Sequence, residues 1–308
     1  MRICSLLPSA TETVYALGAG DELVGVTHEC DFPPEAARKP RVVQTVVDQQ
    51  RMDSETIDRL VRETLRRGES LYRVDEATLA ALRPDVVLLQ DLCDVCAIHP
   101  ASVRGIVQAL PGPPRVLALH PHTLADVWSD IRAVGEAIGR ARAAEALLRA
   151  LHGRLQRVRE RVAGAARPRV FCLEWLAPPM GVGHWVPEMV EWAGGHEVVG
   201  RAGSPSRAVA WEEIAAARPE VMVVMPCGFP IARTLNELPQ IARAPGWQAL
   251  PAVQHGRVYV VNGPAYYQAA GPRVVDGMEL LAGVLHPERC AELAPHGADA
   301  VCVGASTS

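Results

Sequence analysis

"LAALRPDVVLLQDLC" (residues 79–93) and "IAAARPEVMVVMPCG" (residues 214–228) are two versions of one phrase. Each runs from the end of a helix pattern through Arg-Pro and an acid into a short apolar run, and closes near a cysteine. A proline restricts the residue before it and favours a helix end there, and a short Val- and Leu-rich run after such a break is typical of a buried strand. The repetition predicts two halves of the same α/β design.

The repeat extends to both sides of this phrase. Each half opens on an apolar strand pattern, "RICSLL" or "RVFCLEW", and then alternates helices with short buried strands, which is the pattern of parallel sheets. Between the halves, apolar residues recur at helical spacing. The sequence therefore predicts an α/β fold of two Rossmann-like lobes with parallel sheets, residues 1–122 and 165–308, joined by one long helix over 123–164. The second lobe ends in a helix and a tail, and residues 44–72 form an insertion in the first lobe.

Composition excludes several classes of protein. Hydrophobic residues make up 49% and charged residues 21% of the 308, and the net charge is -4, so no basic surface suggests nucleic acid as a partner. No apolar run reaches the roughly 18 residues of a membrane-spanning helix. The first residues, "MRICSLLPSATE", lack the pattern of a signal peptide. We therefore expect a cytoplasmic protein, whose cysteines would be reduced thiols.

Candidate binding residues follow the predicted strands, because in open α/β sheets the loops after the strand C-termini face the binding crevice. In the first half the candidates are Ser9, Glu29, Cys30, Asp31, Phe32, Gln90, Cys93 and Cys96. In the second half they are Glu174, Trp175, His184, Trp185, Cys227, Phe229, Tyr266 and Tyr267.

These residue types suggest contact with a metal or a flat ligand. Cys30, Cys93, Cys96 and Cys227 could ligate a metal ion or a cofactor metal as thiolates, or act as a redox pair, whereas apolar packing is the alternative for each. His28 and His184 could be axial ligands to a metal complex or ordinary hydrogen-bonding residues. The acids could bind amide or amine groups, and the aromatic rings suit a macrocycle.

The two-lobe pattern resembles the class III periplasmic binding proteins, which carry cobalamin, haem and ferric siderophores to ABC transporters. The resemblance rests on "LPSATE" (residues 7–12), "GVTHECDFPP" (25–34), the two repeated strands, "PPMGVGHWVPEMVEWAGG" (178–195) and "GPR" (271–273). It is nearest to the cobalamin-binding proteins, and it implies a ligand held in the cleft between the lobes.

The sequence departs from that family at several positions. Two aromatic positions of the cobalamin pocket are Glu29 and Gln90 here, whereas Tyr266 stays aromatic. Members that dock on a permease carry an acid seven residues before the Pro of each repeated phrase. That position is Glu212 in the second half but Ala77 in the first, which makes an ABC permease a weaker partner.

We therefore expect a non-catalytic binding protein for a metal macrocycle or chelate, with cobalamin or a related corrinoid as the ligand. One alternative is a cytosolic enzyme that uses Cys93, Cys96 and Cys227 with Glu174 as acid or base, and with a bound metal ion. Another is a permease-docked substrate-binding protein. Common catalytic motifs such as H-E-x-x-H and G-x-S-x-G are missing from the sequence.

Overall fold

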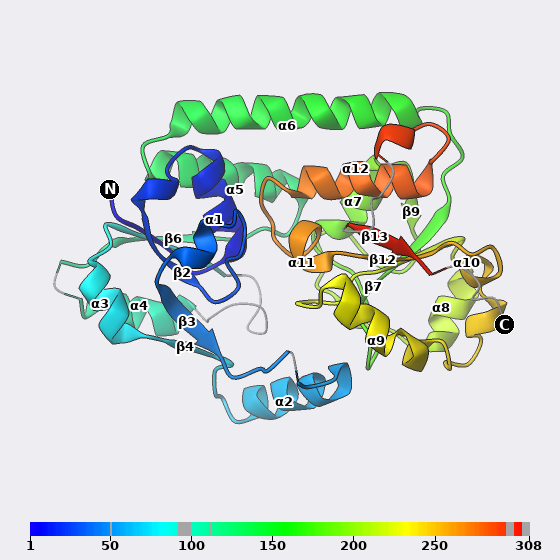
Figure 1. Ribbon diagram of the computed structural model, residues 1–308, viewed down its shortest axis with the longest axis horizontal. Coiled ribbons are helices and arrows are strands. Elements are labelled where there is room, and N and C mark those ends of the chain that lie inside the picture. Colours follow the sequence, from blue (N-terminus) through cyan, green and yellow to red (C-terminus); the bar gives the residue numbers. More distant parts are fainter. Residues whose placement is uncertain (50, 92–99, 111, 294–298, 304–308) are drawn as a thin grey trace. The chain divides into compact units, whose positions relative to one another are not determined.

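A computed structural model describes residues 1–49, 51–91, 100–110, 112–293 and 299–303 of the chain. The chain forms two compact units, each with its own sheet, and Figure 1 labels their elements. Unit 1 comprises Met1–Met52, Arg59–Pro121 and Ala125–Leu151, and unit 2 comprises Asp53–Asp58, His122–Leu124 and His152–Ser308. The predicted two-lobe α/β architecture is confirmed.

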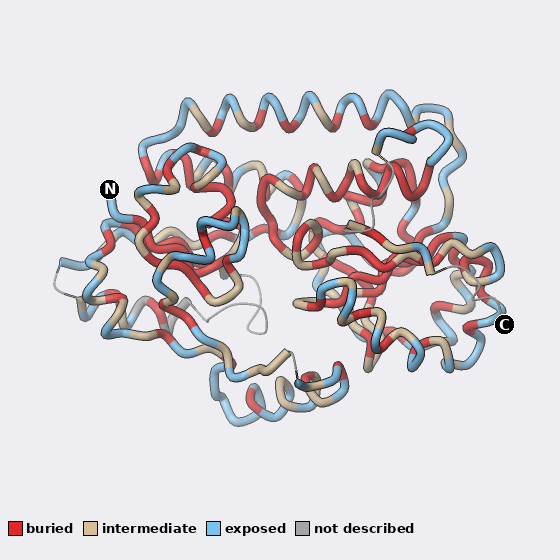
Figure 2. The backbone as a smooth tube through the Cα atoms, in the orientation of Figure 1, coloured by how far each residue is buried: buried red, intermediate tan, exposed pale blue. Residues whose placement is uncertain are grey.

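Unit 1 is built on a six-stranded sheet in the order β4-β3-β2-β1-β5-β6. Its strands are β1 (Ile3–Ser5), β2 (Leu23–Thr27), β3 (Arg41–Thr45), β4 (Tyr72–Val74), β5 (Val86–Gln90) and β6 (Arg115–Leu119). All neighbouring pairs are parallel except β3 with β4. Figure 2 colours buried residues red, and such residues run through the interior of each unit. Residues 86–89 of β5 are buried. This burial explains their unbroken Val and Leu run, since a strand covered on both faces has no polar side.

Unit 2 is built on a seven-stranded sheet in the order β10-β8-β7-β11-β12-β13, with β9 also paired to β7. Its strands are β7 (Arg169–Trp175), β8 (Met180–Gly181), β9 (His196–Glu197), β10 (Arg207–Ala208), β11 (Val221–Val224), β12 (Val258–Val261) and β13 (Ala300–Cys302). Strands β8, β10 and β13 pair antiparallel with their neighbours. The predicted parallel sheets are therefore mixed at their edges, because a short turn such as residues 176–179 can join only antiparallel neighbours.

Helices connect these strands in both units. In the first half they are α1 (Pro8–Ala16), α2 (Ser54–Arg66), α3 (Glu76–Leu82), α4 (Pro100–Gln108), α5 (Leu124–Ala137) and α6 (Ala141–Val162), with 3₁₀ turns η1 (Gly20–Glu22) and η2 (Ala36–Arg38). In the second half they are α7 (Val186–Trp192), α8 (Trp211–Ala217), α9 (Ile231–Ile241), α10 (Pro251–Gln254), α11 (Gly263–Tyr266) and α12 (Val274–Leu285), with η3 (Trp247–Ala249) and η4 (Ala291–Leu293). No helix among the described residues has the length and apolar character that crossing a membrane requires.

The repeated phrase forms the same joint in both units, α3 to β5 and α8 to β11. Each helix ends on an arginine in the left-handed conformation, Arg83 at φ 43° and Arg218 at φ 47°. The following proline begins the approach to the strand. The left-handed residue turns the chain sharply out of the helix, so the Arg-Pro pair is the local cause of the helix end.

The acid of the phrase ties the strand to its neighbour. The Asp85 carboxylate accepts a hydrogen bond from the backbone N–H of Arg2 at 2.7 Å, just before β1. The Glu220 carboxylate accepts one from the backbone N–H of Arg169 at 2.8 Å, where β7 begins. The two acids thus have one structural role, and the repeated phrase reflects duplicated architecture.

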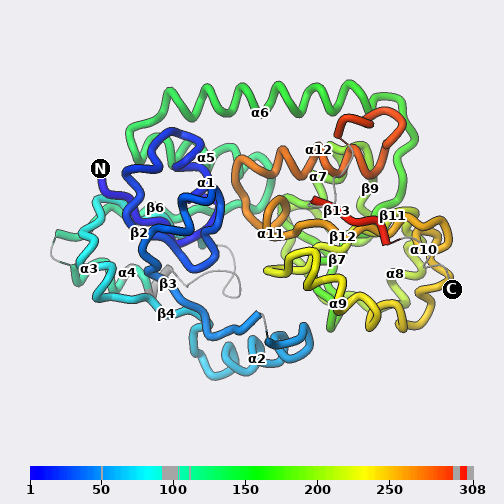
Figure 3. Tube along the Cα trace, in the orientation of Figure 1, coloured from blue at the N-terminus to red at the C-terminus, as the bar shows by residue number. Residues whose placement is uncertain are grey.

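The predicted continuous helix over 123–164 is divided into α5 and α6, as the turn in Figure 3 shows. Gly139 is left-handed at φ 70°. The N–H of Arg140 donates to Gly135 O at 2.6 Å and the N–H of Gly139 to Glu136 O at 3.3 Å. These two bonds form the Schellman C-cap that glycine favours. The helical spacing of apolar residues therefore continued through the point where one helix ends and the next begins. Helix α6, with 22 residues and a length of about 33 Å, passes from unit 1 into unit 2.

The inserted segment is also not confined to the first unit. It contains α2, whose first turn lies in unit 2 because Asp53–Asp58 belongs there. Ser54 is completely buried, and its N–H donates to Glu237 Oε2 at 3.1 Å. Glu237 is 3% exposed and forms an ion pair with Arg233. The N-terminus of α2 therefore packs against α9 through the buried carboxylate of Glu237. The dipole of α2 favours a negative charge at this end of the helix.

Candidate ligand-binding site

The candidates of unit 1 follow three adjacent strands. Ser9 lies in α1 after β1, residues 28–32 follow β2, and Gln90 ends β5. Strand β1 lies between β2 and β5 in the sheet and is parallel to both, so these loops leave the same edge of the sheet. Ser9 is 4% exposed, and its carbonyl accepts a hydrogen bond from the Thr13 hydroxyl within α1.

Cys30 is a buried thiol in this edge. It is 1% exposed, and its Sγ lies 3.0 Å from the hydroxyl of Thr11. Burial, the largest cause, raises the pKa of Cys30 to about 12. Because the thiolate is the form that attacks disulfides, this environment disfavours a redox role of Cys30 at neutral pH, whereas its role as a metal ligand stays a prediction.

Glu29 is the carboxyl group at this edge with the most altered acidity. Burial, with a smaller contribution from Asp31, raises the pKa of Glu29 to about 7. The neighbouring His28 has a lowered pKa because of burial and the charge of Arg41, and its Nε2 lies 3.9 Å from Glu29 Oε1. Near neutral pH, Glu29 is therefore divided between its acid and carboxylate forms and can both donate and accept hydrogen bonds. Phe32, three residues after Glu29 in the sequence, is 43% exposed.

Unit 2 gathers an aromatic and acidic group where β7 and β11 end. The rings of Trp175 and Phe229 lie 5.2 Å apart, tilted by 55°. The N–H of Cys227 donates to Glu174 O at 3.0 Å, and the Ser206 hydroxyl donates to Glu174 Oε2. Four predicted residues, Glu174, Trp175, Cys227 and Phe229, are thus brought together by adjacent parallel strands.

The two tyrosines after β12 have different surroundings. Tyr266 donates its hydroxyl to Asp299 Oδ1 at 2.5 Å, and the Arg273 guanidinium lies 5.0 Å from its ring centre. Tyr267 is 2% exposed and donates to Gly277 O at 3.0 Å. Tyr266 keeps a part-exposed face, whereas Tyr267 belongs to the core of unit 2 and offers no surface to a ligand.

The loop between β8 and α7 carries His184 and Trp185. His184 has a positive φ of 52°, and its ring lies 5.7 Å from that of His122 and 5.9 Å from that of Trp185. Burial and the neighbouring His122 lower the pKa of His184, so it is a neutral imidazole near pH 7. Trp185 is 5% exposed.

The predicted thiolate metal site is not supported. Among the described residues, no group of three or more His, Cys, Asp or Glu side chains is arranged to hold a metal ion. Cys30 is protonated, and Cys227 lies partly buried beside Glu174. Cys93 and Cys96 lie outside the described residues.

A buried carboxylate of unit 2, that of Glu197, was not among the predicted residues. Glu197 is 6% exposed and accepts hydrogen bonds from the N–H groups of Cys172, Val199 and Gly200, each at 3.0 Å. Burial raises its pKa, although the three donors oppose the shift. The sequence shows only an acid beside apolar residues in a short strand. A strand with one face exposed to solvent would show the same pattern, so the acid did not stand out.

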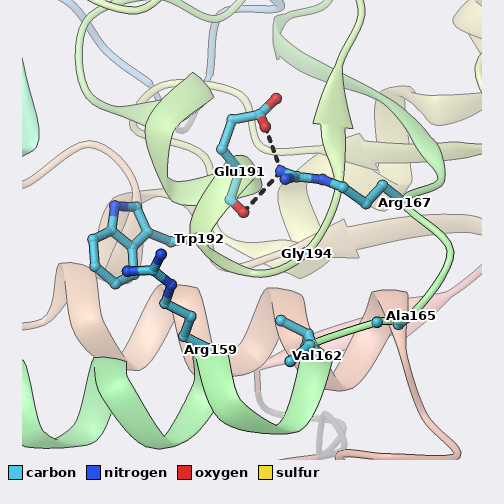
Figure 4. A pocket seen from close by; sticks show the side chains of 9 residues that line it. Arg159, Val162, Ala165, Arg167, Glu191, Trp192 and Gly194 are labelled. Atoms are coloured by element: carbon cyan, nitrogen blue, oxygen red, sulfur yellow. Dashed lines mark hydrogen bonds and ion pairs between the residues drawn. The ribbon is translucent and has the colours of Figure 1, made fainter.

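A surface hollow of about 450 Å³ lies elsewhere in unit 2, at the N-terminal end of β7. Figure 4 shows Arg159 beside the Trp192 ring and Arg167 bonded to Glu191. The Arg159 guanidinium lies 5.7 Å from the Trp192 ring centre. Because the candidate residues follow the C-terminal ends of the strands, this hollow is separate from their site.

Comparisons with known proteins agree with this architecture. An ABC transporter substrate-binding lipoprotein of uncharacterized function from Bacillus subtilis (strain 168), YvrC, is 24% identical over 93% of this chain and 80% of its own length. A vitamin B12-binding protein of Vibrio cholerae is 26% identical over 90% of this chain and 86% of its own length. The crystal structure of a periplasmic heme binding protein from Pseudomonas aeruginosa has a TM-score of 0.72 at 20% identity, over 94% of this chain and 93% of its own.

The predicted cytoplasmic location is wrong. Residues 3–265 match the model of a family described as "Periplasmic binding protein", and the relatives include a lipoprotein, which point to a location outside the cytoplasm. The prediction rested on the first residues of the sequence, which do not determine the location. The expectation that the cysteines lie in a reducing environment depended on that location and is withdrawn. Members of the matched family are solute-binding proteins rather than enzymes. With most of its length matched, this chain belongs to the periplasmic binding protein family.

Proposed function

We propose that this protein is the substrate-binding component of an ABC transporter and that its cargo is a metal macrocycle, namely cobalamin or a related corrinoid. The family membership and the vitamin B12-binding relatives support the binding role. The part-exposed ring of Trp175, which packs on the buried ring of Phe229, supports a large flat ligand. The enzyme alternative, which used Cys93, Cys96 and Cys227, loses its support because members of the matched family are solute-binding proteins rather than enzymes.

One observation carries the choice of a corrinoid over haem: carboxyl groups follow the strands in both units. Glu29 and Asp31 follow β2, and Glu174 is the last residue but one of β7. Haem presents two propionate carboxylates, which these acids would repel, whereas a corrinoid presents carboxamides that can donate to them. Glu29 already has a pKa of about 7 because of burial and Asp31, and an anionic ligand would raise it further at a cost in affinity.

The test is an absorbance titration of the purified protein with aquocobalamin and, separately, with haemin. We expect a saturable shift of the corrin bands near one equivalent of aquocobalamin and weaker binding of haemin. Tight binding of haemin without any corrinoid binding would contradict the assignment and would make haem the cargo. Binding of neither would leave the family membership intact and require a different chelate.

Docking to a permease is proposed through α3 and α8, which are equivalent in the two units. Glu212, at the docking position that the family resemblance implies, is exposed in the first turn of α8. In α3 the matching position is Ala77, and Glu76 is the exposed acid beside it. Charged residues at the edge of an interface govern association with the partner more than they govern folding.

Replacing Glu212 with arginine is expected to lower cellular uptake of cyanocobalamin by about tenfold, because a charge reversal in an interface costs affinity and association rate. The dissociation constant of the purified variant for cyanocobalamin should stay within about twofold of wild type. Uptake of labelled ligand is measured in cells whose own copy of the gene is deleted. Glu160→Arg makes the same charge change on α6 and serves as the control. Equal uptake by the two variants would rule out docking through Glu212.

A further inference from the structure

The loop that carries His184 is held in a conformation that few residues adopt. His184 has φ 52°, a region that costs a non-glycine residue about 1 kcal/mol or more. Its N–H donates to Ser204 O at 2.7 Å, and its carbonyl accepts from the N–H of Gly203 at 3.0 Å. Gly183 leaves room for this approach, since a Cβ there would lie 2.3 Å from Ser204 O. The surrounding backbone therefore fixes the direction of the His184 side chain.

Two adjacent side chains in this loop present polar atoms that the structure leaves without a partner. His184 Nδ1 and Trp185 Nε1 are both enclosed, and neither makes a hydrogen bond. Trp185 as a whole is 5% exposed. Buried polar atoms are nearly always paired in native proteins, and each unpaired one costs about 1–3 kcal/mol. Strained backbone and unpaired buried polar atoms both occur preferentially at functional sites, and both are found at this pair of residues.

The charges nearby decide which kind of group suits this pair. Burial and His122 keep His184 neutral by lowering its pKa, so one ring nitrogen can accept a hydrogen bond. The Trp185 indole can only donate. The Ser206 hydroxyl, from the same loop as Ser204, is bonded to the carboxylate of Glu174. A ligand carboxylate would meet that like charge, whereas a neutral carboxamide would not.

We propose that His184 and Trp185 form a carboxamide-recognition pair, in which Trp185 Nε1–H donates to the carbonyl oxygen of a ligand amide and His184 Nδ1 accepts from its N–H. The two rings are neighbours, with their centres 5.9 Å apart, and each hydrogen bond to the amide would be about 2.9 Å long. The inference rests on the proposed corrinoid function and deepens it, because it selects ligands by their peripheral amides.

The experiment compares cyanocobalamin with its monocarboxylic acids, in which one peripheral amide has been hydrolysed. Cyanide occupies a coordination position of the cobalt, so direct ligation by histidine contributes little to the comparison. We expect wild type to bind at least one of the monoacids about tenfold more weakly than cyanocobalamin, as befits a lost hydrogen bond beside buried polar atoms. Trp185→Phe keeps the aromatic ring and removes only the donor. It should bind cyanocobalamin about tenfold more weakly and lose the preference over that monoacid.

Two further variants make the result decisive. Trp192→Phe is the control and should bind like wild type, because Trp192 ends the helix that follows Trp185 and lines the hollow beside Arg159. His184→Asn removes the imidazole with a residue that tolerates positive φ, and it should also lose the amide preference. If Trp185→Phe matches Trp192→Phe in both affinity and preference, or loses only thermal stability, the recognition pair is wrong while corrinoid binding stands. If wild type binds no corrinoid, the proposed function itself fails.

Discussion

Replacing Glu197 with alanine is expected to lower the free energy of unfolding of unit 2 by about 3 kcal/mol or more. The carboxylate is enclosed and accepts from three backbone N–H groups, those of Cys172, Val199 and Gly200. Alanine would leave all three donors unsatisfied, at about 1–3 kcal/mol for each that stays buried. Denaturant unfolding followed by tryptophan fluorescence measures the loss.

Two comparisons identify the cause of that loss. Glu213→Ala removes an exposed acid paired with Arg207 and should change stability by no more than about 0.5 kcal/mol. Glu197→Gln keeps one acceptor oxygen and should destabilise less than alanine. A loss below about 1 kcal/mol for Glu197→Ala would mean that the three donors find other acceptors.

The stability of wild type should also depend on pH through Glu197. Burial raises the folded-state pKa of this carboxyl above its unfolded value. Its contribution is therefore most favourable below the unfolded pKa and declines as pH rises through the folded pKa. Because Glu197→Gln cannot ionise, a series of unfolding experiments at increasing pH should show this decline in wild type and a smaller one in the variant.

Replacing Trp175 with alanine is expected to weaken aquocobalamin binding by about 30-fold, which corresponds to about 2 kcal/mol. The ring is part exposed at the end of β7 and is supported by Phe229, which is completely buried beneath the Arg233 guanidinium. A large aromatic face on a rigid support is the kind of group that dominates the affinity for a flat ligand. Titration of the corrin bands gives the two dissociation constants.

Trp211→Ala is the matched control for this change. Trp211 also belongs to an aromatic pair of unit 2, with its ring 6.0 Å from that of Trp247, but it lies in α8, before β11 rather than after it. Both variants lose a supported tryptophan, so a general loss of stability would affect both. If the two variants bind aquocobalamin equally well, Trp175 does not contact the ligand.

Local sequence features predicted most of the parallel strands and their order of appearance, but not the short antiparallel strands β4, β8, β10 and β13. The Arg-Pro breaks, the acid and the Val-rich runs act over a few residues, and each has the same structural role in both units. Asp85 and Glu220, for example, each accept a hydrogen bond from the backbone N–H at or just before the start of a neighbouring strand. The division of α5 from α6 was not predicted, although Gly139 was visible in the sequence. A glycine with no proline beside it is compatible with a helix interior, and only the left-handed φ and the two C-cap hydrogen bonds distinguish the end.

The sequence by itself determined the duplicated α/β design and the residues that follow each strand, because those depend on periodicity and on short-range turn chemistry. Only the tertiary structure decided what each of those residues can do. Cys30 is a protonated thiol and Tyr267 a core residue because of what encloses them. Glu197 is an anchor because the N–H of Cys172, 25 residues away in the chain, joins the N–H groups of Val199 and Gly200 from its own turn. Burial and long-range hydrogen bonds arise between segments distant in the chain, so no local pattern records them.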